Sequence, residues 1–350
     1  MMRMTAGAMI ARAFVTGAIL TVASVGANAQ GTGSATIDAI IKRGELNCGT
    51  AGNSPMFSLP DSQGVMRGLD ADFCRSLAAA ILGDAKKVKF IPTTAQNRFT
   101  ALQAGEVDLL YRSTTWTLGR EANLGTMFAS VNFYDGTGFL VKKSLGVKTA
   151  KEMDGASICV APGTSTELAV ADFFREHKIK FTPIIIADVN EIQNAYLAGR
   201  CDAYSTDASG LAGFRFQQGA KATDHVLLPD IISKEPLGPV VRQGDSQFFT
   251  LAKWVYFAML NLEEAGITQA NVDEMMKSTN PDIKRLLGTE GEFGKGLGVA
   301  NDWAYQIAKK VGNYGEVYDR HFGPNTPINI ERGQNKLWTQ GGLQYAPPVR

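Results

Sequence analysis

The stretch ALQAGEVDLLYRS, residues 101–113, holds the pattern that decides the fold. It is typical of a helix end, a glycine stop at Gly105 and a short buried strand that ends in polar residues. The stretch AYLAGRCDAYSTD, residues 195–207, repeats the order Ala-Gly, two residues, Asp, strand and polar end. It predicts that two halves share one architecture. Chance similarity stays an alternative, because such glycine punctuation is common.

The residues around each stretch alternate between strand and helix patterns. The first half predicts strands at 45–51, 87–92 and 107–111, and helices at 69–82 and 97–104. The second half predicts strands at 157–161, 180–187 and 201–204, and helices at 164–177, opened by the capping box Thr164–Glu167, and 191–198. This alternation predicts an α/β fold with mostly parallel, buried sheets.

Three polar stretches fall where such sheets bind ligands. Ligands sit at the carboxyl ends of parallel strands, near helix N-termini. RSTTWTLGR (112–120), PGTSTE (162–167) and YSTD (204–207) occupy those places. They converge if the two halves face each other across a cleft.

The rest of the chain supplies connections and helices. Residues 142–149 are predicted to cross out of the first half, and 234–243, with two prolines, to return to it. An apolar helix is expected at 248–262. Helical parts within 273–287 and 302–323 and an extended, proline-rich end complete the chain.

The composition sets limits on function. The chain has 350 residues, enough for two domains, and a formal net charge of +1. It lacks the basic runs of a nucleic-acid-binding protein, so no nucleic-acid partner is expected.

The N-terminus has the features of a secretory signal. Arg3 and Arg12 form a positive start, an apolar run from Ala13 to Val25 follows, and Ala27-Asn28-Ala29 forms a small-x-small cleavage site. We expect a signal peptide at 1–29, with an uncleaved membrane anchor as the alternative.

Catalytic and metal-binding patterns are scarce. The three histidines, His177, His225 and His321, form no HExxH motif, and neither GxSxG nor a Walker loop occurs. The four cysteines include no CxxC pair, so no metal site or cofactor is expected. Export permits disulfides. Three pairings, and also unpaired thiols, remain open at this level.

Binding groups suited to a zwitterion are plentiful. A carboxylate needs a guanidinium and backbone N–H groups, which Arg120 and the helix start at Ser165 can supply. An ammonium needs a carboxylate and further acceptors, and Asp207 is available. Ser113 and Thr115 can serve either end of the ligand with carbonyl and hydroxyl groups.

Structural roles compete with these assignments. Arg120 can be a surface helix arginine, and Asp207 can be the N-cap of a helix that begins at Ala208. Thr164 is a cap candidate, which does not exclude a binding role. Trp116 is a possible pocket wall, although packing in the core or hinge is the stronger interpretation.

Several of these motifs resemble one known family. GLDADFCRSLAAAI (68–81), Thr-Leu-Gly-Arg (117–120), PGTSTE and GRCDAYSTD (199–207) together resemble the type II periplasmic binding proteins for polar amino acids, which feed ABC importers. The segments 233–245 and 341–350 resemble the general L-amino-acid-binding branch. Residues between about 265 and 311 are an addition to the minimal family pattern.

The resemblance implies roles for individual residues. The carboxylate-binding arginine of the family falls on Arg120, its paired hydroxyl residues on Ser113 and Thr115, and its ammonium-binding aspartate on Asp207. Its helix-start N–H donors fall on Thr164 and Ser165.

The side-chain pocket is less well defined by the resemblance. In the binders of acidic amino acids, QNR supplies an arginine to the ligand side chain, and this motif falls on 96–98, hence on Arg98. A surface position at a helix start is the alternative for Arg98. The loop 51–61 carries Phe57 as its only aromatic residue, a possible pocket wall.

The implied fold is the two-lobed type II periplasmic-binding-protein fold, each lobe a mainly parallel sheet flanked by helices, hinged by two crossover strands. Lobe 1 is expected at 30–141 plus 241–350 and lobe 2 at 142–240. This division favours the disulfides Cys48–Cys74 and Cys159–Cys201, each within one lobe, because a bridge across the lobes would resist closure.

The implied function is that of a monomeric periplasmic solute-binding component. It captures L-amino acids, polar or acidic ones preferred, by closing its lobes and delivers them to an ABC permease. The alternatives are a periplasmic cyclohexadienyl dehydratase on the same fold, for which no clear catalytic acid besides Asp207 is present, and the sensor lobe of a receptor.

Overall fold

The computed structural model describes residues 31–350. The predicted signal peptide, 1–29, and its cleavage site lie outside these residues. Within the described part, no helix combines the length and apolar character needed to cross a membrane.

The first of two five-stranded sheets has the order β4-β1-β5-β14-β6. Its strands are β1 (Leu46–Thr50), β4 (Val88–Pro92), β5 (Leu109–Leu110), β6 (Thr126–Phe128) and β14 (Val240–Arg242). β1 lies between β4 and β5 and runs parallel to both, whereas β14 runs antiparallel to β5 and β6. The predicted strands of the first half are therefore confirmed, with β5 shorter than expected.

The second sheet has the order β10-β9-β11-β8-β12. Its strands are β8 (Thr137–Lys142), β9 (Ala156–Val160), β10 (Phe181–Ile185), β11 (Ala203–Asp207) and β12 (His225–Leu227). Here β9 runs parallel to β10 and β11, and β8 runs antiparallel to β11 and β12. The two sheets thus give the two-lobed α/β fold that the sequence predicted, each sheet mixed rather than purely parallel.

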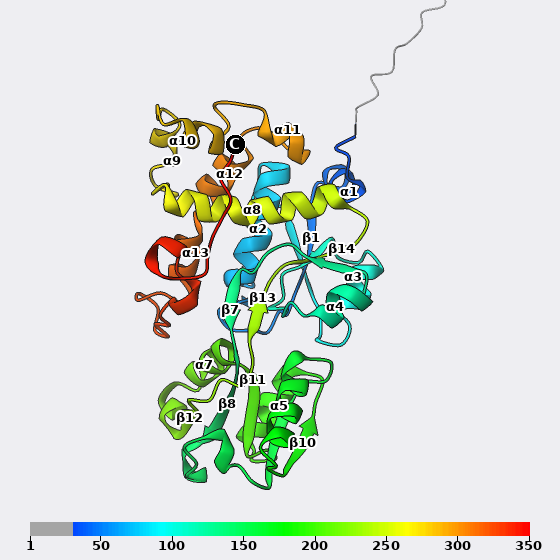
Figure 1. Ribbon diagram of the computed structural model, residues 1–350, viewed down its shortest axis with the longest axis vertical. Helices are drawn as coiled ribbons and strands as arrows, with labels where there is room; N and C mark the ends of the chain where they lie inside the picture. Colours follow the sequence, from blue (N-terminus) through cyan, green and yellow to red (C-terminus); the bar gives the residue numbers. More distant parts are fainter. Residues whose placement is uncertain (1–30) are drawn as a thin grey trace, which may run out of the picture. The chain divides into compact units, whose positions relative to one another are not determined.

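Two short strands connect the sheets (Figure 1). β7 (Phe133–Asp135) leads from β6 to β8, β13 (Glu235–Leu237) leads from β12 back to β14, and the two pair antiparallel. The prediction of a first crossover at 142–149 is wrong, because β8 already pairs within the second sheet. The predicted return at 234–243 contains β13. The lobe boundaries 30–141, 142–240 and 241–350 stay a prediction.

Helices flank the sheets and complete the described chain. They are α1 (Ala35–Arg43), α2 (Leu69–Leu82), α3 (Arg98–Gln103), α4 (Leu118–Asn123), α5 (Ser165–Glu176), α6 (Val189–Leu197), α7 (Ala208–Gln217), α8 (Ser246–Glu264), α9 (Val272–Met275), α10 (Pro281–Leu286), α11 (Phe293–Leu297), α12 (Trp303–Lys310) and α13 (Tyr314–His321). A small hairpin, β2 (Leu59–Pro60) with β3 (Met66–Arg67), precedes α2.

The two stretches that were matched by sequence adopt the same local structure. After α3 and α6, Gly105 and Gly199 take left-handed backbone angles, φ 75° and 78°, which end each helix. Asp108 Oδ2 then accepts from the N–H of Asn47, and Asp202 Oδ2 accepts from the N–H of Ser157, both at 2.8 Å. Each aspartate thereby ties the start of its strand, β5 or β11, to the parallel neighbouring strand, β1 or β9.

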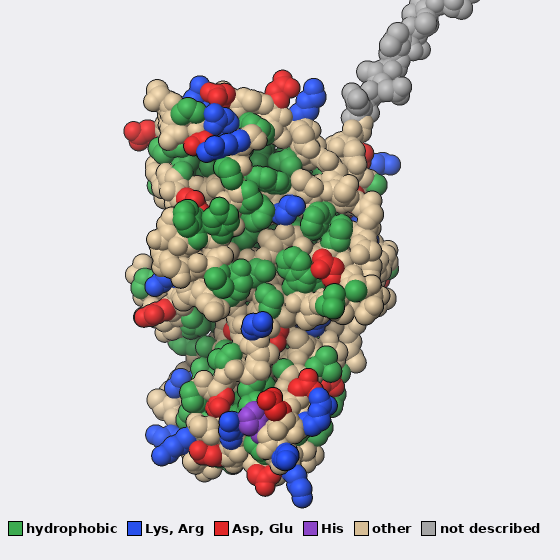
Figure 2. Space-filling model, viewed as in Figure 1, with side chains coloured by type: hydrophobic (Ala, Val, Ile, Leu, Met, Phe, Trp, Pro, Cys, Tyr) green, Lys and Arg blue, Asp and Glu red, His purple; other side chains and the backbone are tan. Residues whose placement is uncertain are grey.

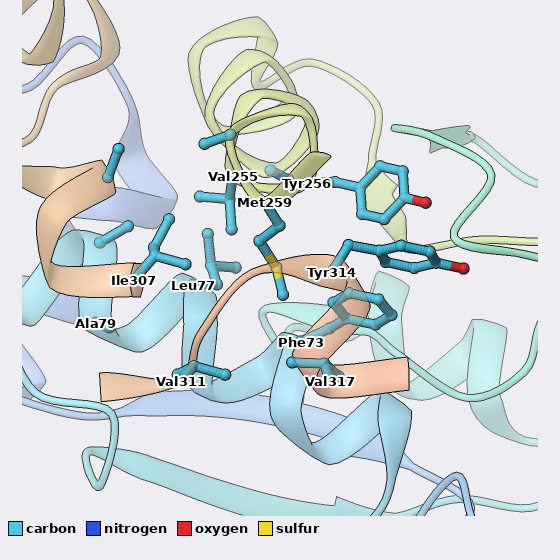
Figure 3. Packing of buried hydrophobic residues seen from close by; sticks show 14 of the residues in the cluster. Phe73, Leu77, Ala79, Val255, Tyr256, Met259, Ile307, Val311, Tyr314 and Val317 are labelled. Atoms are coloured by element: carbon cyan, nitrogen blue, oxygen red, sulfur yellow. The ribbon is translucent and has the colours of Figure 1, made fainter. Parts of the chain in front are cut away.

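The largest apolar core belongs to the first lobe. It joins α2, α8, α12 and α13, and Figure 3 shows Leu77, Val255, Met259 and Ile307 converging between these helices. Such interiors are close-packed. This core therefore holds in fixed positions the first-lobe residues that face the second sheet. The long helix α8, yellow in Figure 1, lies across this part of the molecule.

The second lobe has two smaller cores, one on each face of its sheet. Phe139 and Ile158 belong to one cluster, while their neighbours Leu140 and Cys159 belong to the other. Alternate residues of a strand point to opposite faces, which explains this division.

Both predicted disulfides are present. Cys48 in β1 pairs with Cys74 in α2, and Cys159 in β9 pairs with Cys201 just before β11. The Cα–Cα distances are 6.1 and 5.7 Å, within the usual range for a disulfide. Each bridge therefore lies within one lobe, and neither bridge links the two lobes.

The visible surface carries both charges. In Figure 2, hydrophobic side chains gather over the region of α8, whereas Lys and Arg are interspersed with Asp and Glu around the second sheet. This mixture agrees with the near-zero net charge of the sequence.

Candidate functional site

A cavity of about 100 Å³ lies between the two sheets, at the carboxyl ends of β5, β9 and β11. Eight residues proposed from the sequence line it: Phe57, Arg98, Ser113, Thr115, Arg120, Thr164, Ser165 and Asp207. The fold therefore brings together side chains that are up to 150 positions apart in the chain. Their role as ligand contacts stays a prediction.

Arg120 is held in place by its own helix start. Thr117 is the N-cap of α4 and accepts from the N–H of Arg120. The guanidinium donates from Nη1 to the carbonyl oxygen of Thr115 at 2.6 Å and lies 5.5 Å from the Phe99 ring centroid. Arg120 is half-buried, so it is not the surface arginine that the sequence left open. Its remaining N–H groups can bind a carboxylate.

Two further arginines face the same cavity. Arg98 begins α3 but is only 2% exposed, so a surface role is excluded, and its Nε has no hydrogen-bond partner within residues 31–350. Arg112 follows β5 and donates from Nε to the carbonyl oxygen of Thr93. Burial lowers the pKa of both guanidinium groups, that of Arg112 to about 10, and the mutual repulsion of the arginines adds to this effect.

Asp207 provides the opposite charge. It occupies the N-cap position of α7, yet its side chain makes no capping hydrogen bond. Asp135 from β7 takes that role, because its carboxylate accepts from the N–H and the hydroxyl of Ser209. Burial, together with the charges of Asp135 and Glu235, raises the pKa of Asp207. An ammonium beside Asp207 would relieve this cost by pairing with the carboxylate.

A buried carboxyl supports the cationic side of the cavity. Asp70 in α2 is 2% exposed and accepts from the N–H of Ser113 at 2.9 Å and from its hydroxyl at 3.1 Å. These bonds hold Ser113 in a left-handed conformation with φ 42°, which is uncommon outside glycine. Burial raises the pKa of Asp70 to about 7.

The start of α5 provides backbone donors. Thr164 is its N-cap and accepts from the N–H of Glu167 at 3.1 Å, as the predicted capping box requires. The reciprocal bond differs, since the Glu167 carboxylate accepts from Gly163 rather than from Thr164. The first N–H groups of a helix have no partner within it, so this end of α5 can receive an anion.

Hydroxyl groups from both lobes meet at one carboxylate. Thr115 Oγ1 and Ser165 Oγ lie 3.0 Å apart, and both donate to Glu235 Oε2, at 2.5 and 2.8 Å. Thr115 follows β5 of the first sheet, Ser165 begins α5 beside the second, and Glu235 begins the crossover strand β13.

The family model for bacterial extracellular solute-binding proteins, family 3, matches residues 46–324. The chain belongs to this family.

Two relatives are similar to this solute-binding protein over nearly its whole length and theirs. The chain is 50% identical to the general L-amino acid-binding periplasmic protein AapJ of Rhizobium johnstonii, covering 94% of this chain and 96% of that protein. It is 51% identical to the glutamate/glutamine/aspartate/asparagine-binding protein BztA of Rhodobacter capsulatus, covering 91% and 94%.

A solved structure supports the same fold. An ABC transporter periplasmic binding protein from Brucella ovis, with glutathione bound, has a TM-score of 0.87 and 50% identity, covering 90% of this chain and 99% of that one. The family, the relatives and this structure agree with the resemblance drawn from the sequence motifs.

Two aromatic residues differ in their relation to the cavity of this solute-binding protein. Phe57 lines it while packing against Phe133 and Phe322 in the first-lobe core. Trp116 is not among the residues that line it, which favours the packing role that the sequence indicated. Its ring stacks on Phe128 at 5.6 Å, and its Nε1 donates to Glu121.

Sequence reasoning missed two charged residues. Arg112 lies in the same RSTTWTLGR stretch as Ser113 and Arg120, and that stretch was the signal that could have found it. Glu235, 1% exposed, stands between a lysine and a proline and looks like part of a solvated loop. None of the three histidines lines the cavity.

Proposed function

We propose that this solute-binding protein is the periplasmic component of an ABC importer that binds L-amino acids between its lobes, acidic and polar ones preferred. The observation that carries the proposal is the charge pattern of the cavity. Arg98, Arg112 and Arg120 line the cavity without a hydrogen bond to a carboxylate, while Asp207 is the acidic residue that lines it with them. A zwitterion with an additional acidic or polar side chain complements this pattern.

Each end of the ligand has suitable partners. The α-carboxylate binds Arg120 and the N–H groups at the start of α5, and the ammonium binds Asp207 with the hydroxyl groups of Thr115 and Ser165. Arg98 meets the side chain. Its buried, partly unpartnered guanidinium is costly without an anion, which favours a ligand with a second carboxylate or an amide oxygen.

Closure follows from the distribution of these groups. Arg120 and Arg98 belong to the first lobe, whereas Ser165 and Asp207 belong to the second. A ligand that contacts both sides binds the closed form more tightly and shifts the population toward it. Hydrogen bonds to charged groups contribute roughly 1.5–3 kcal/mol each, so several of them support micromolar or tighter binding. The permease then receives the ligand from the closed form.

The names of the relatives agree with this choice of ligand. AapJ is named for general L-amino acids and BztA for glutamate, glutamine, aspartate and asparagine. We extend this ligand class, the periplasmic location and the permease partner to this chain. The cyclohexadienyl dehydratase alternative is not favoured, because relatives at 50% identity are named as binding proteins.

Calorimetry on protein that begins at Gln30 tests the proposal. We expect L-glutamate to bind and Arg98→Met to weaken its affinity by about tenfold or more, with little change for L-alanine. Arg175→Met, on the exposed face of α5, serves as the matched control. Failure of all common L-amino acids to bind would contradict the proposed function, whereas equal losses for both ligands would contradict only the role of Arg98.

A further inference from the structure

Glu235 lies behind the cavity and not in its wall. Its side chain is 1% exposed, while Thr115 and Ser165, which donate to its Oε2, both line the cavity. Its other oxygen, Oε1, accepts from the hydroxyl groups of Thr137 at 3.1 Å and Ser233 at 2.5 Å. The carboxylate therefore collects four hydroxyl protons at the point where the chain crosses between the lobes.

A count of protons shows what this arrangement leaves for a ligand. A hydroxyl group has one proton to donate and two lone pairs that accept, and an ionised carboxylate only accepts. When Thr115 and Ser165 both donate to Glu235, neither proton remains for the cavity. Their contact of 3.0 Å then joins two oxygens that present lone pairs to the same space.

The alternative arrangement is weaker. If Thr115 donated to Ser165, or the reverse, Glu235 would lose one charge-assisted hydrogen bond, which is roughly twice as strong as a neutral one. If both protons turned toward a ligand carboxylate, Glu235 would lose both donors at Oε2. The buried charge of Glu235 therefore keeps the hydroxyl protons of Thr115 and Ser165 directed at its Oε2 and away from the cavity.

We infer that Glu235 is a positioning residue of the binding site, which takes the protons of Thr115 and Ser165 and thereby fixes both hydroxyl groups as acceptors for the ammonium of the ligand. This inference rests on the proposed function and specifies how that site distinguishes an amino acid from the same acid without its amine.

The position of Glu235 links this recognition to closure. Thr115 belongs to the first lobe, Ser165 to the second, and Glu235 to the strand that joins them. The pair of acceptors exists only while both hydroxyl groups reach the same carboxylate oxygen. The ammonium is consequently recognised by the closed form and not by either lobe alone.

Electrostatics support the same role. Burial lowers the pKa of Arg120, and the charge of Glu235 opposes this shift. Burial raises the pKa of Asp207, and the charges of Asp135 and Glu235 add to this shift. Glu235 is therefore within electrostatic reach of both groups that would hold the ligand, although it touches neither. Its negative charge favours an ammonium at this end of the cavity.

Displacement calorimetry with L-glutamate and glutarate, which has both carboxylates but no amine, tests the inference. Glu235→Gln keeps the size of the side chain and removes the charge, and its amide has one acceptor oxygen in place of two. We expect the preference of the protein for L-glutamate over glutarate to fall by about tenfold or more.

Thr137→Val is the matched control. It removes one donor to Glu235 from the side facing away from the cavity, so it perturbs the same network without touching the acceptor pair. We expect its preference for L-glutamate to stay within about threefold of the wild type, a change smaller than the net effect of one charged hydrogen bond.

The outcomes separate the inference from the proposed function. Equal losses for both ligands in Glu235→Gln would indicate a purely structural residue, and an unchanged preference would also overturn the inference. If Glu235→Gln does not fold, Ser165→Ala takes its place, and its preference must fall because one acceptor is gone. A wild type that binds neither ligand would overturn the proposed function and this inference with it.

Discussion

The ends of β5 and β11 are built alike and carry opposite charges. Both strands follow a helix, a left-handed glycine and an aspartate that ties them to the parallel neighbouring strand, β1 or β9. The first strand leads into Arg112 and Ser113, and the second ends in Thr206 and Asp207. One local structure, used twice, thus places arginines at one side of the cavity and an aspartate at the other, and the two sides complement the two ends of a zwitterion.

The backbone behind each strand end is held by a carboxyl group in a similar way. Asp70 accepts from the N–H and hydroxyl of Ser113 on the cationic side, and Asp135 accepts from the same groups of Ser209 on the anionic side. Burial raises the pKa of both, to about 7 and about 6. Asp70 and Asp135 therefore hold the backbone next to the charged residues that line the cavity.

Removal of Arg120, the arginine proposed to bind the α-carboxylate, is expected to have the largest effect on ligand affinity. Arg120→Ala should weaken L-glutamate binding by about a hundredfold or more, because two charge-assisted hydrogen bonds to the α-carboxylate are lost. Calorimetry measures the affinity. Arg175→Ala, with an exposed side chain on α5, should bind as the wild type does. An unchanged affinity in Arg120→Ala would remove this residue from the site.

Removal of the anionic charge should come next. Asp207→Asn keeps the shape of the side chain but loses the charge, so L-glutamate should bind about ten- to a hundredfold more weakly. Glutarate should lose much less, since it has no amine. The control is Asp172→Asn, whose side chain is exposed on α5. Similar losses for both ligands would assign Asp207 a structural role instead.

The buried support of the cationic side of the cavity predicts a dependence of stability on pH. The pKa of Asp70 is raised from 3.8 to about 7, so folding favours its protonated form. This contribution is complete below pH 4, and it falls as the pH rises to about 7, by up to about 1.4 kcal/mol per pH unit. Asp70→Asn cannot ionise and should lack that part of the fall.

Urea unfolding between pH 4 and 8 measures this effect. The free energy of unfolding of Asp70→Asn, relative to the wild type, should increase with pH through this window and level off above pH 7. A constant difference between the two proteins would show that Asp70 does not change its protonation there.

The smallest expected effect is the difference in stability between substitutions of Asp108 and of Asp202, the two aspartates that tie neighbouring strands. Asp108 is buried and also pairs with Arg43, so Asp108→Asn should lower the free energy of unfolding by about 1–3 kcal/mol. Asp202 is exposed, and Asp202→Asn should cost less than about 1 kcal/mol. Urea titration compares them. Equal losses would show that burial does not set the difference between the repeats.

Much of this comparison could be predicted from the sequence, because it depends on local signals. Gly105, Gly199 and the Thr164 cap mark helix ends through backbone geometry that few other residues allow. The polar residues that follow each buried strand then fall at the same sheet edge. Six of the proposed residues, those in the stretches 112–120, 162–167 and 204–207, reach the cavity for this reason.

The connections were harder to predict because they are short and their partners are distant in sequence. β7 and β13 have three residues each, too few to show an alternating pattern, and they pair across about 100 positions. The role of Glu235 depends on four hydroxyl groups that donate to it and that come together only in the folded protein. The sequence left two roles open for Trp116 because its neighbours Thr115 and Arg120 line the cavity, while its own ring packs on Phe128.

The order of the cysteines has a consequence for biogenesis. Cys48 pairs with Cys74, 26 positions later, and Cys159 pairs with Cys201, 42 positions later. In a polypeptide that emerges from a translocation channel N-terminus first, each thiol therefore meets its native partner before any later thiol arrives. Oxidation in order of emergence gives the correct connectivity, so the export that we propose for this protein should require an oxidant but little reshuffling by an isomerase.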